Sequence, residues 1–217
     1  MRPMTVSVHL VRHGEVLNPD KVLYGRLPGF GLSPLGQQMA QELAEGWETT
    51  PEILVSSPLQ RAQETIAPLA EKFRMDVRTE QRVLEAENKF QGLSNMRNQL
   101  RSPKLWPLIL NPFRPSWGEP YAKQVARMAA AIQELRDELM LRYGPGSSAV
   151  VVSHQLPIWV TRLSAEGKML AHDPRRRQCA LASVTSFHFA PGQRVPTVSY
   201  TEPVEHLSQH AAALPGA

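Results

Sequence analysis

Short runs of apolar and β-branched residues recur along the chain, separated by longer stretches with helical periodicity. The clearest run, SAVVVS at residues 148–153, carries no charge and ends at a histidine. Uncharged runs of this length, bounded by turn residues, are typical of buried strands. On this pattern we expect strands at residues 5–11, 52–56, 75–79, 148–153, 180–189 and 195–201.

Amphipathic stretches between these runs predict helices. Ser33-Pro34 combines a good N-cap residue with a proline in the first turn, and Ser57-Pro58 repeats the pattern. Strands that alternate with helices predict an α/β fold of three layers, with a mostly parallel central sheet and helices on both faces. We expect the helices at residues 34–47, 59–73, 119–143 and from about residue 156.

Length and composition fit one globular domain over residues 1–217, 42% of them hydrophobic and 20% charged. These values exclude a fully disordered chain, a collagen and a disulfide scaffold. The net charge of +4 is compatible with an anionic ligand, but no nucleic-acid-binding motif accompanies it. Neither a signal peptide nor a run of ~20 apolar residues is present. We therefore expect a cytoplasmic protein without a membrane or nucleic-acid partner.

Residues 86–118 differ in composition from the rest of the chain. The segment holds four prolines, two tryptophans and five basic residues, but one acidic residue. Long irregular segments inside a compact domain are usually functional. We expect a lid here, and a flexible tail at residues 204–217.

Two predicted strands lead into a histidine, and both histidines have basic or hydroxyl neighbours. Arg12-His13-Gly14 follows the first strand, His154 follows the strand at residues 148–153, and Arg61 opens the helix after residues 52–56. Neighbouring strands would bring these four side chains to one sheet edge, where ligands bind. Taken singly, each is more often structural. Together they suit a phosphate, because guanidinium groups pair with its oxygens and neutral imidazole attacks phosphorus.

Longer blocks around these residues resemble the histidine phosphatase superfamily, which has the phosphoglycerate mutase-like fold. The blocks keep the family's order and cover roughly residues 5–165. In that family the insert that follows the catalytic acid caps the active site, so the resemblance makes residues 86–118 a loop or helical cap. The blocks are Arg12-His13-Gly14-Glu15, Tyr24-Gly25-Arg26-Leu27, Leu32-Ser33-Pro34-Leu35-Gly36-Gln37, Ser56-Ser57-Pro58-Leu59-Gln60-Arg61-Ala62-Gln63-Glu64-Thr65 and Val152-Ser153-His154.

The resemblance implies a role for each residue of the cluster. His13 is expected to be the nucleophile that becomes phosphohistidine, and the phosphate pocket is expected to consist of Arg12, Arg61 and His154. Their fixed positive charge acts on the transition state, so neither a metal ion nor another cofactor is expected. A carboxylic acid must still protonate the leaving oxygen. Glu85 has the better register for this role, with Glu87 as the alternative.

Other positions depart from the family's pattern or extend the site. Val16 replaces a hydroxyl residue, Asn18 stands one position early, and Gln155 stands where glycine is frequent. Substrate contacts are expected from Asn18, Arg26 and Gln155. The Arg175-Arg176-Arg177 run would suit a distal anionic group, but a solvated basic patch is the favoured interpretation.

The resemblance predicts a metal-independent phosphatase that hydrolyses a small phosphorylated substrate. A mutase of the phosphoglycerate type is the alternative, since the same histidine would serve it, although the Arg-Arg pair of mutase inserts is missing from residues 86–118. A catalytically inactive relative that binds phosphorylated ligands is the third hypothesis, disfavoured because His13 is present. Dimers are frequent among relatives, so the resemblance also allows a homodimer.

Overall fold

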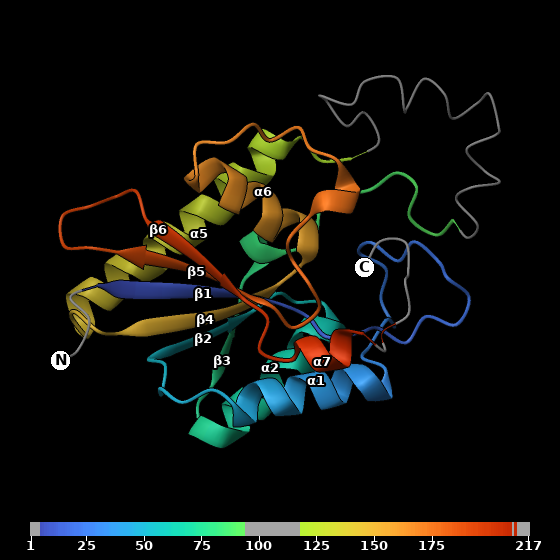
Figure 1. The fold of residues 1–217 in the computed structure, drawn as a ribbon, viewed down its shortest axis with the longest axis horizontal. Helices are drawn as coiled ribbons and strands as arrows, with labels where there is room; N and C mark the ends of the chain where they lie inside the picture. Colours follow the sequence, from blue (N-terminus) through green and yellow to red (C-terminus); the bar gives the residue numbers. More distant parts are fainter. Residues whose placement is uncertain (1–4, 94–117, 210, 212–217) are drawn as a thin grey trace.

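The computed structural model describes residues 5–93, 118–209 and 211. In this part of the chain six strands form a mixed sheet in the order β3-β2-β4-β1-β5-β6 (Figure 1). Strands β3, β2, β4 and β1 run parallel, and β5 and β6 complete the sheet as an antiparallel pair. The predicted α/β fold with a mostly parallel sheet is confirmed. The strands are β1 (Val6–Arg12), β2 (Ile53–Ser56), β3 (Val77–Thr79), β4 (Ser148–Ser153), β5 (Val184–Phe189) and β6 (Thr197–Thr201).

Helices cover both faces of this sheet, as the alternating pattern predicted. Figure 1 shows α1 (Pro34–Glu45), α2 (Gln60–Phe73) and the short α7 (Glu205–Ser208) below it. Above it lie α5 (Tyr121–Arg142) and α6 (Gln155–Ala165). In the described connecting segments lie the single-turn 3-10 helices η1 (Gln81–Val83) and η3 (Pro174–Arg176).

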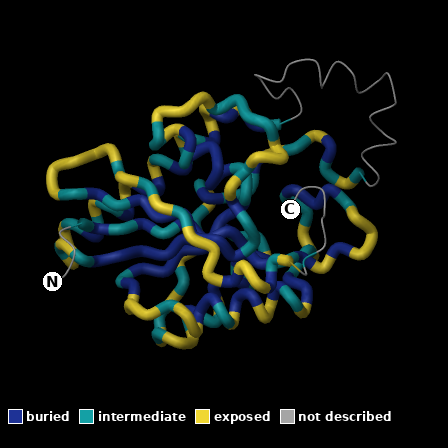
Figure 2. The backbone as a smooth tube through the Cα atoms, in the orientation of Figure 1, coloured by how far each residue is buried: buried dark blue, intermediate teal, exposed yellow. Residues whose placement is uncertain are grey.

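The sheet separates two apolar cores. Alternate side chains of a strand point to opposite faces, so Val8 and Leu10 of β1 pack with α5, whereas Val11 packs with α1 and α2. The central strands β2 and β4 are buried along their whole length, whereas every residue of the edge strand β6 is partly or fully exposed (Figure 2). The ends of the central strands are therefore held in place from both sides.

Several element boundaries differ from the sequence prediction by one to four residues, and two of the differences have a local cause. Ser33 caps α1 as expected, since its Oγ accepts the Gly36 N–H at 3.0 Å. The Ser57-Pro58 prediction was wrong, because α2 begins at Gln60, after Leu59 at the N-cap position. The expected strand at residues 180–189 starts only at Val184, because Ala182 adopts a left-handed φ of 52° in the preceding turn.

The expected lid and tail lie partly outside the described residues. Of residues 86–118, the structure describes 86–93 and 118, and the ends of the segment pair through a bridge between Asn88 and Gly118. Of the expected tail at 204–217 the structure describes 204–209 and 211, and in this part Val204 and Leu207 are buried in the core beside α1. No helix in the described ranges is long and apolar enough to cross a membrane.

Candidate active site

The register of the central strands brings both predicted histidines to one place. Arg12 at the end of β1 pairs with Ser153 at the end of β4, so the next residues, His13 and His154, face each other with ring centroids 5.3 Å apart. The His13 N–H donates to the Ser153 carbonyl at 3.2 Å. The expected convergence at the carboxyl end of the sheet is thus present in the structure.

The turn after His13 packs tightly, which explains its glycine. A Cβ on Gly14 would lie 2.7 Å from the backbone oxygen of Gly36 at the start of α1. The Gly14 N–H instead donates to Thr65 Oγ1 at 3.1 Å, and that hydroxyl donates to the Arg61 carbonyl at 2.6 Å. Thr65 therefore ties the first turn of α2 to the end of β1, which positions Arg61 beside His13.

His13 is held in the form that a nucleophile needs. Its ring is buried, and Nδ1 lies 2.8 Å from the Gly14 carbonyl oxygen, to which it must donate. This leaves Nε2 with a free lone pair. Burial, followed by the charges of Arg61 and Arg12, holds the pKa of His13 well below its usual range. The ring is therefore neutral at physiological pH.

His154 is held by the serine that the helix prediction misassigned. Its Nε2 lies 2.7 Å from Ser57 Oγ, so Ser57 positions an imidazole instead of capping α2. Nδ1 is buried without a hydrogen-bond partner in the described part of the chain and lies 4.0 Å from Glu85 Oε2. Burial, together with Arg61 and His13, lowers the pKa of His154 well below its usual value.

Two arginines give this histidine pair a strongly positive environment. Arg12 Nη1 donates to the Cys179 carbonyl at 2.6 Å, and Arg61 Nη2 donates to the Gly25 carbonyl at 2.7 Å. Arg61 also lies over the Tyr24 ring, 4.7 Å from its centroid. Both Nε atoms are buried and have no partner among the described residues. Two buried cations whose hydrogen bonds to described residues go to carbonyl oxygens, not carboxylates, suit a dianionic ligand.

The structure separates the two candidate proton donors. Glu85 Oε1 accepts the Ala86 N–H at 2.8 Å, and burial raises the pKa of Glu85 against the opposing charges of Arg61, Arg177 and Arg12. Glu87 has a 63% exposed side chain and forms an ion pair with Arg26 at 3.0 Å. Of the two, Glu85 is therefore the carboxyl that lies beside the histidines.

The guanidinium of Arg26 is engaged mainly by other residues of the protein. Its Nε donates to the Glu85 carbonyl at 2.7 Å, and its Nη atoms contact Glu87 at 3.0 Å and Glu119 at 3.3 Å. Glu119 is buried and also accepts two hydrogen bonds from Arg127, both at 2.9 Å. This network, which the sequence analysis did not identify, holds the Glu85 loop, and substrate contact by Arg26 stays a prediction.

Asn18 has a similar structural function, because its side-chain amide donates to the Val22 carbonyl at 2.8 Å and accepts the Val22 N–H at 3.0 Å.

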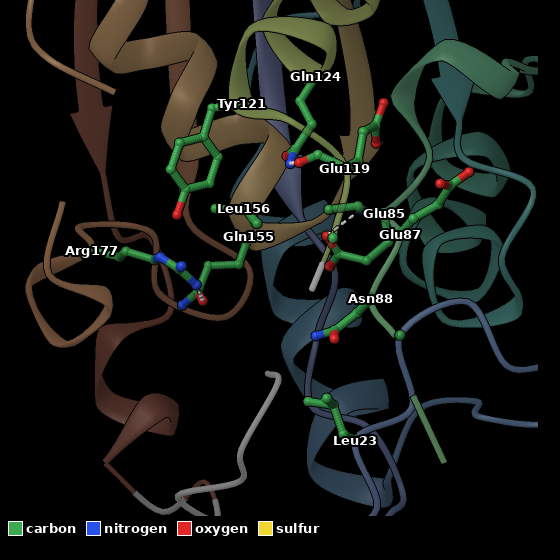
Figure 3. Close-up of a pocket in the computed structure, with 13 residues that line it drawn as sticks. Leu23, Glu85, Glu87, Asn88, Glu119, Tyr121, Gln124, Gln155, Leu156 and Arg177 are labelled. Carbon is green, nitrogen blue, oxygen red and sulfur yellow. Dashed lines mark hydrogen bonds between the residues drawn. The ribbon is translucent and has the colours of Figure 1, made fainter. Parts of the chain in front are cut away.

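Gln155 lines a pocket together with Glu85, as Figure 3 shows. Arg177 and Tyr121 line the same pocket, on the side away from Glu119. Arg175 and Arg176 are exposed, so the solvated-patch interpretation holds for two members of the run and not for Arg177. Among the described residues no group of three or more metal-ligating side chains is found.

Known proteins resemble this chain in sequence and in fold. The family model of the histidine phosphatase superfamily (branch 1) matches residues 8–200. The uncharacterized protein Rv0525 of Mycobacterium tuberculosis is 46% identical over 204 residues, which cover 93% of this chain and 98% of that protein.

Solved structures share the fold at lower identity. The mycobacterial glucosyl-3-phosphoglycerate phosphatase Rv2419c is 24% identical with a TM-score of 0.73, over 90% of this chain and 97% of that one. Phosphoserine phosphatase from Entamoeba histolytica, solved with 3-phosphoglyceric acid, is 21% identical with a TM-score of 0.74, over 93% and 99% of the two chains. The sheet and its helices thus have the phosphoglycerate mutase-like fold.

Proposed function

The chain belongs to the histidine phosphatase superfamily, and we propose that it hydrolyses a small phosphomonoester through a phosphohistidine on His13. The observation that carries this proposal is the environment of His13. Its ring is neutral, its Nδ1 proton is engaged by the Gly14 carbonyl, and two buried arginines lie beside it. The two arginines would bind the negatively charged phosphoryl group, and the lone pair on His13 Nε2 would be available to attack its phosphorus.

In the first step the Nε2 lone pair of His13 attacks phosphorus, and the bond from phosphorus to the ester oxygen breaks. The electron pair of that bond stays on the leaving oxygen, which takes the proton of Glu85. The raised pKa of Glu85 suits this donor role, because it keeps the carboxyl protonated at a higher pH than an exposed glutamate. Arg12 and Arg61 stabilise the charge that spreads over the transferring phosphoryl oxygens.

In the second step water attacks the phosphohistidine. Glu85, now a carboxylate, takes a proton from the water as the new oxygen–phosphorus bond forms and the nitrogen–phosphorus bond breaks. Inorganic phosphate leaves, and His13 and Glu85 return to their starting forms. The Nδ1 atom of His154 and the Nε atoms of both arginines are buried and have no hydrogen-bond partner among the described residues, and phosphoryl oxygens would satisfy them.

The names of the solved relatives favour hydrolysis over a mutase reaction, because both are phosphatases. The alternative differs only in whether water or a second substrate hydroxyl accepts the phosphoryl group. Transfer to phosphoglycerates primed with a bisphosphate, without net release of phosphate, would identify a mutase.

The test is hydrolysis of p-nitrophenyl phosphate in excess EDTA by the wild type and by His13→Ala. We expect His13→Ala to lose roughly 10³-fold or more in kcat/KM, and the wild type to form an acid-labile phosphoenzyme. His206→Ala is the matched control, because His206 is exposed on α7 and pairs with Glu42. Retained activity in His13→Ala, or a requirement for metal, would contradict the proposal.

A further inference from the structure

Arg177 is placed in the pocket by contacts that leave part of its guanidinium free. It follows η3, and its Nε donates to His172 Nε2 at 2.9 Å while Nη1 donates to Gln155 Oε1 at 3.2 Å. In the part of the chain that the structure describes, Nη2 has no hydrogen bond. Figure 3 shows the guanidinium beside Gln155, on the pocket wall opposite Glu119.

His172 fixes the orientation of this group. Its Nδ1 lies 2.7 Å from the Leu170 carbonyl and must donate to it, so Nε2 is left as the acceptor for Arg177. Burial lowers the pKa of His172, which keeps the ring neutral and preserves this arrangement. The ring also lies against Tyr121, with centroids 5.5 Å apart. Arg177 is therefore held in one geometry before any ligand binds.

Among the described residues, the charge of Arg177 has no direct counter-ion. Within the described ranges no carboxylate lies within 4.0 Å of it, whereas its neighbour Arg175 pairs with Asp173 at 2.9 Å. Glu85 is near enough for the charges of the two groups to influence each other, and so is Arg12. Burial lowers the pKa of Arg177 itself, which reflects the cost of holding this cation away from water. The acids on the opposite wall, Glu87 and Glu119, are paired with Arg26.

Arg177 is thus a fixed cation whose Nη2 has no hydrogen bond and whose charge has no carboxylate partner among the described residues. Such a group is suited to bind an acidic group on a ligand. We propose that Arg177, aided by Gln155 and Tyr121, binds a second acidic group of the substrate, so that the enzyme prefers phosphomonoesters bearing such a group close to the phosphate. The inference rests on the phosphatase reaction proposed above and adds the substrate class to it. A carboxylate suits the planar fork of a guanidinium, and a second phosphate shares that chemistry.

Two substrates that differ only at this group provide the test. 3-Phosphoglycerate and glycerol 3-phosphate share a three-carbon chain and one phosphate, and the first has a carboxylate where the second has an alcohol. We expect the wild type to prefer 3-phosphoglycerate, and Arg177→Gln to lower the ratio of the two kcat/KM values by about tenfold or more. Arg177→Lys should restore part of the ratio. Glycerol 1,3-bisphosphate distinguishes a second phosphate from a carboxylate.

Arg176→Gln is the matched control, because it removes the same charge from an exposed neighbour and should leave the ratio as in the wild type. An equal fall for both substrates in Arg177→Gln, or a wild type that prefers glycerol 3-phosphate, would overturn the subsite. Thermal unfolding checks that each variant folds. If Arg177→Gln does not fold, Tyr121→Phe and Arg177→Lys are compared instead, and an unchanged ratio in both overturns the inference.

Failure of the subsite and failure of the proposed reaction give different results. If the wild type hydrolyses p-nitrophenyl phosphate but the ratio of the two kcat/KM values does not depend on Arg177, the proposed reaction stands and the subsite is rejected. If the wild type hydrolyses none of these compounds, the proposed reaction is rejected. Calorimetric binding of 3-phosphoglycerate and glycerol 3-phosphate to the wild type and Arg177→Gln then decides the subsite on its own, by the same tenfold criterion in the ratio of Kd values.

Discussion

Replacement of Glu119 by glutamine tests whether a buried ion pair holds the Glu85 loop. The Glu119 side chain is 3% exposed and receives hydrogen bonds from Arg127 at 2.9 Å and from Arg26 at 3.3 Å. Both arginines also hold the segment before and at Glu85, because Arg127 donates to the Arg82 carbonyl and Arg26 to the Glu85 carbonyl. The substitution keeps the shape of the side chain and removes its charge.

The expected loss of stability follows from the burial of the pair. Removing one partner of a buried ion pair costs about 3–5 kcal/mol, and the partial exposure of the arginines, 15% and 25%, reduces this to about 2–3 kcal/mol. For a chain of this length that is roughly 4–12 °C in Tm. Thermal unfolding followed by circular dichroism measures the change. At 25 °C, where the variant is folded, we also expect kcat to fall about tenfold as Glu85 loses its position.

Glu138→Gln is the control for this experiment. Glu138 also pairs with two arginines, Arg78 at 2.7 Å and Arg142 at 3.2 Å, but their side chains are 51% and 63% exposed. An exposed pair of this kind contributes about 0–1 kcal/mol. Equal losses in the two variants, or a Glu119→Gln protein with the Tm and kcat of the wild type, would refute the reasoning from burial.

Three further predictions concern packing and pH. Gly36→Ala should lower the free energy of unfolding by about 2 kcal/mol in urea titrations, because the new Cβ would collide with the Glu15 carbonyl. Gly46→Ala is the control and should change the free energy far less, because its Cβ meets nothing closer than 3.4 Å. Similar losses in the two variants would contradict this account. The plot of kcat/KM against pH should stay high to a pH above the usual glutamate range before it falls, because the pKa of Glu85 is raised and the proton donor must be protonated. If Glu85→Gln shows the same fall at high pH, Glu85 is not the donor. Burial and the charge of His188 lower the pKa of His9 to about 4 from its ordinary 6.5, so the unfolded chain binds the extra proton between these values and the folded chain does not. Stability should therefore be complete above pH 6.5 and fall by about 3 kcal/mol as pH drops to 4, with a flatter profile in His9→Gln.

The sequence pattern predicted the parts of the site that follow directly from strand ends. His154 comes directly after an uncharged run, and His13 comes after another with Arg12 between. Such runs are typical of buried strands, and parallel neighbours place their carboxyl ends at one edge. Arg61 followed from its place at the start of a helix after the next strand. Local sequence was enough to predict these positions. A buried strand ends at a defined edge of the sheet, so the residues that follow it are placed at that edge.

Side chains whose partners lie in a different element or loop of the fold needed the tertiary structure. Ser57 has the same local sequence as Ser33, yet Ser33 caps α1 whereas Ser57 binds His154, 97 residues later. Arg177 stands in a run of three arginines that look alike in sequence, and the pocket selects one of them through His172 and Gln155.

The sequence by itself therefore determined the α/β class, the strand ends and the cluster of histidines and arginines, because hydrophobic periodicity and local turn chemistry act over a few residues. The tertiary structure decided which glutamate lies beside the histidines, what Arg26 holds and which arginine enters the pocket. Hydrogen bonds, burial and charge depend on distances in space, and local sequence does not record those distances for partners 22 to 97 residues apart.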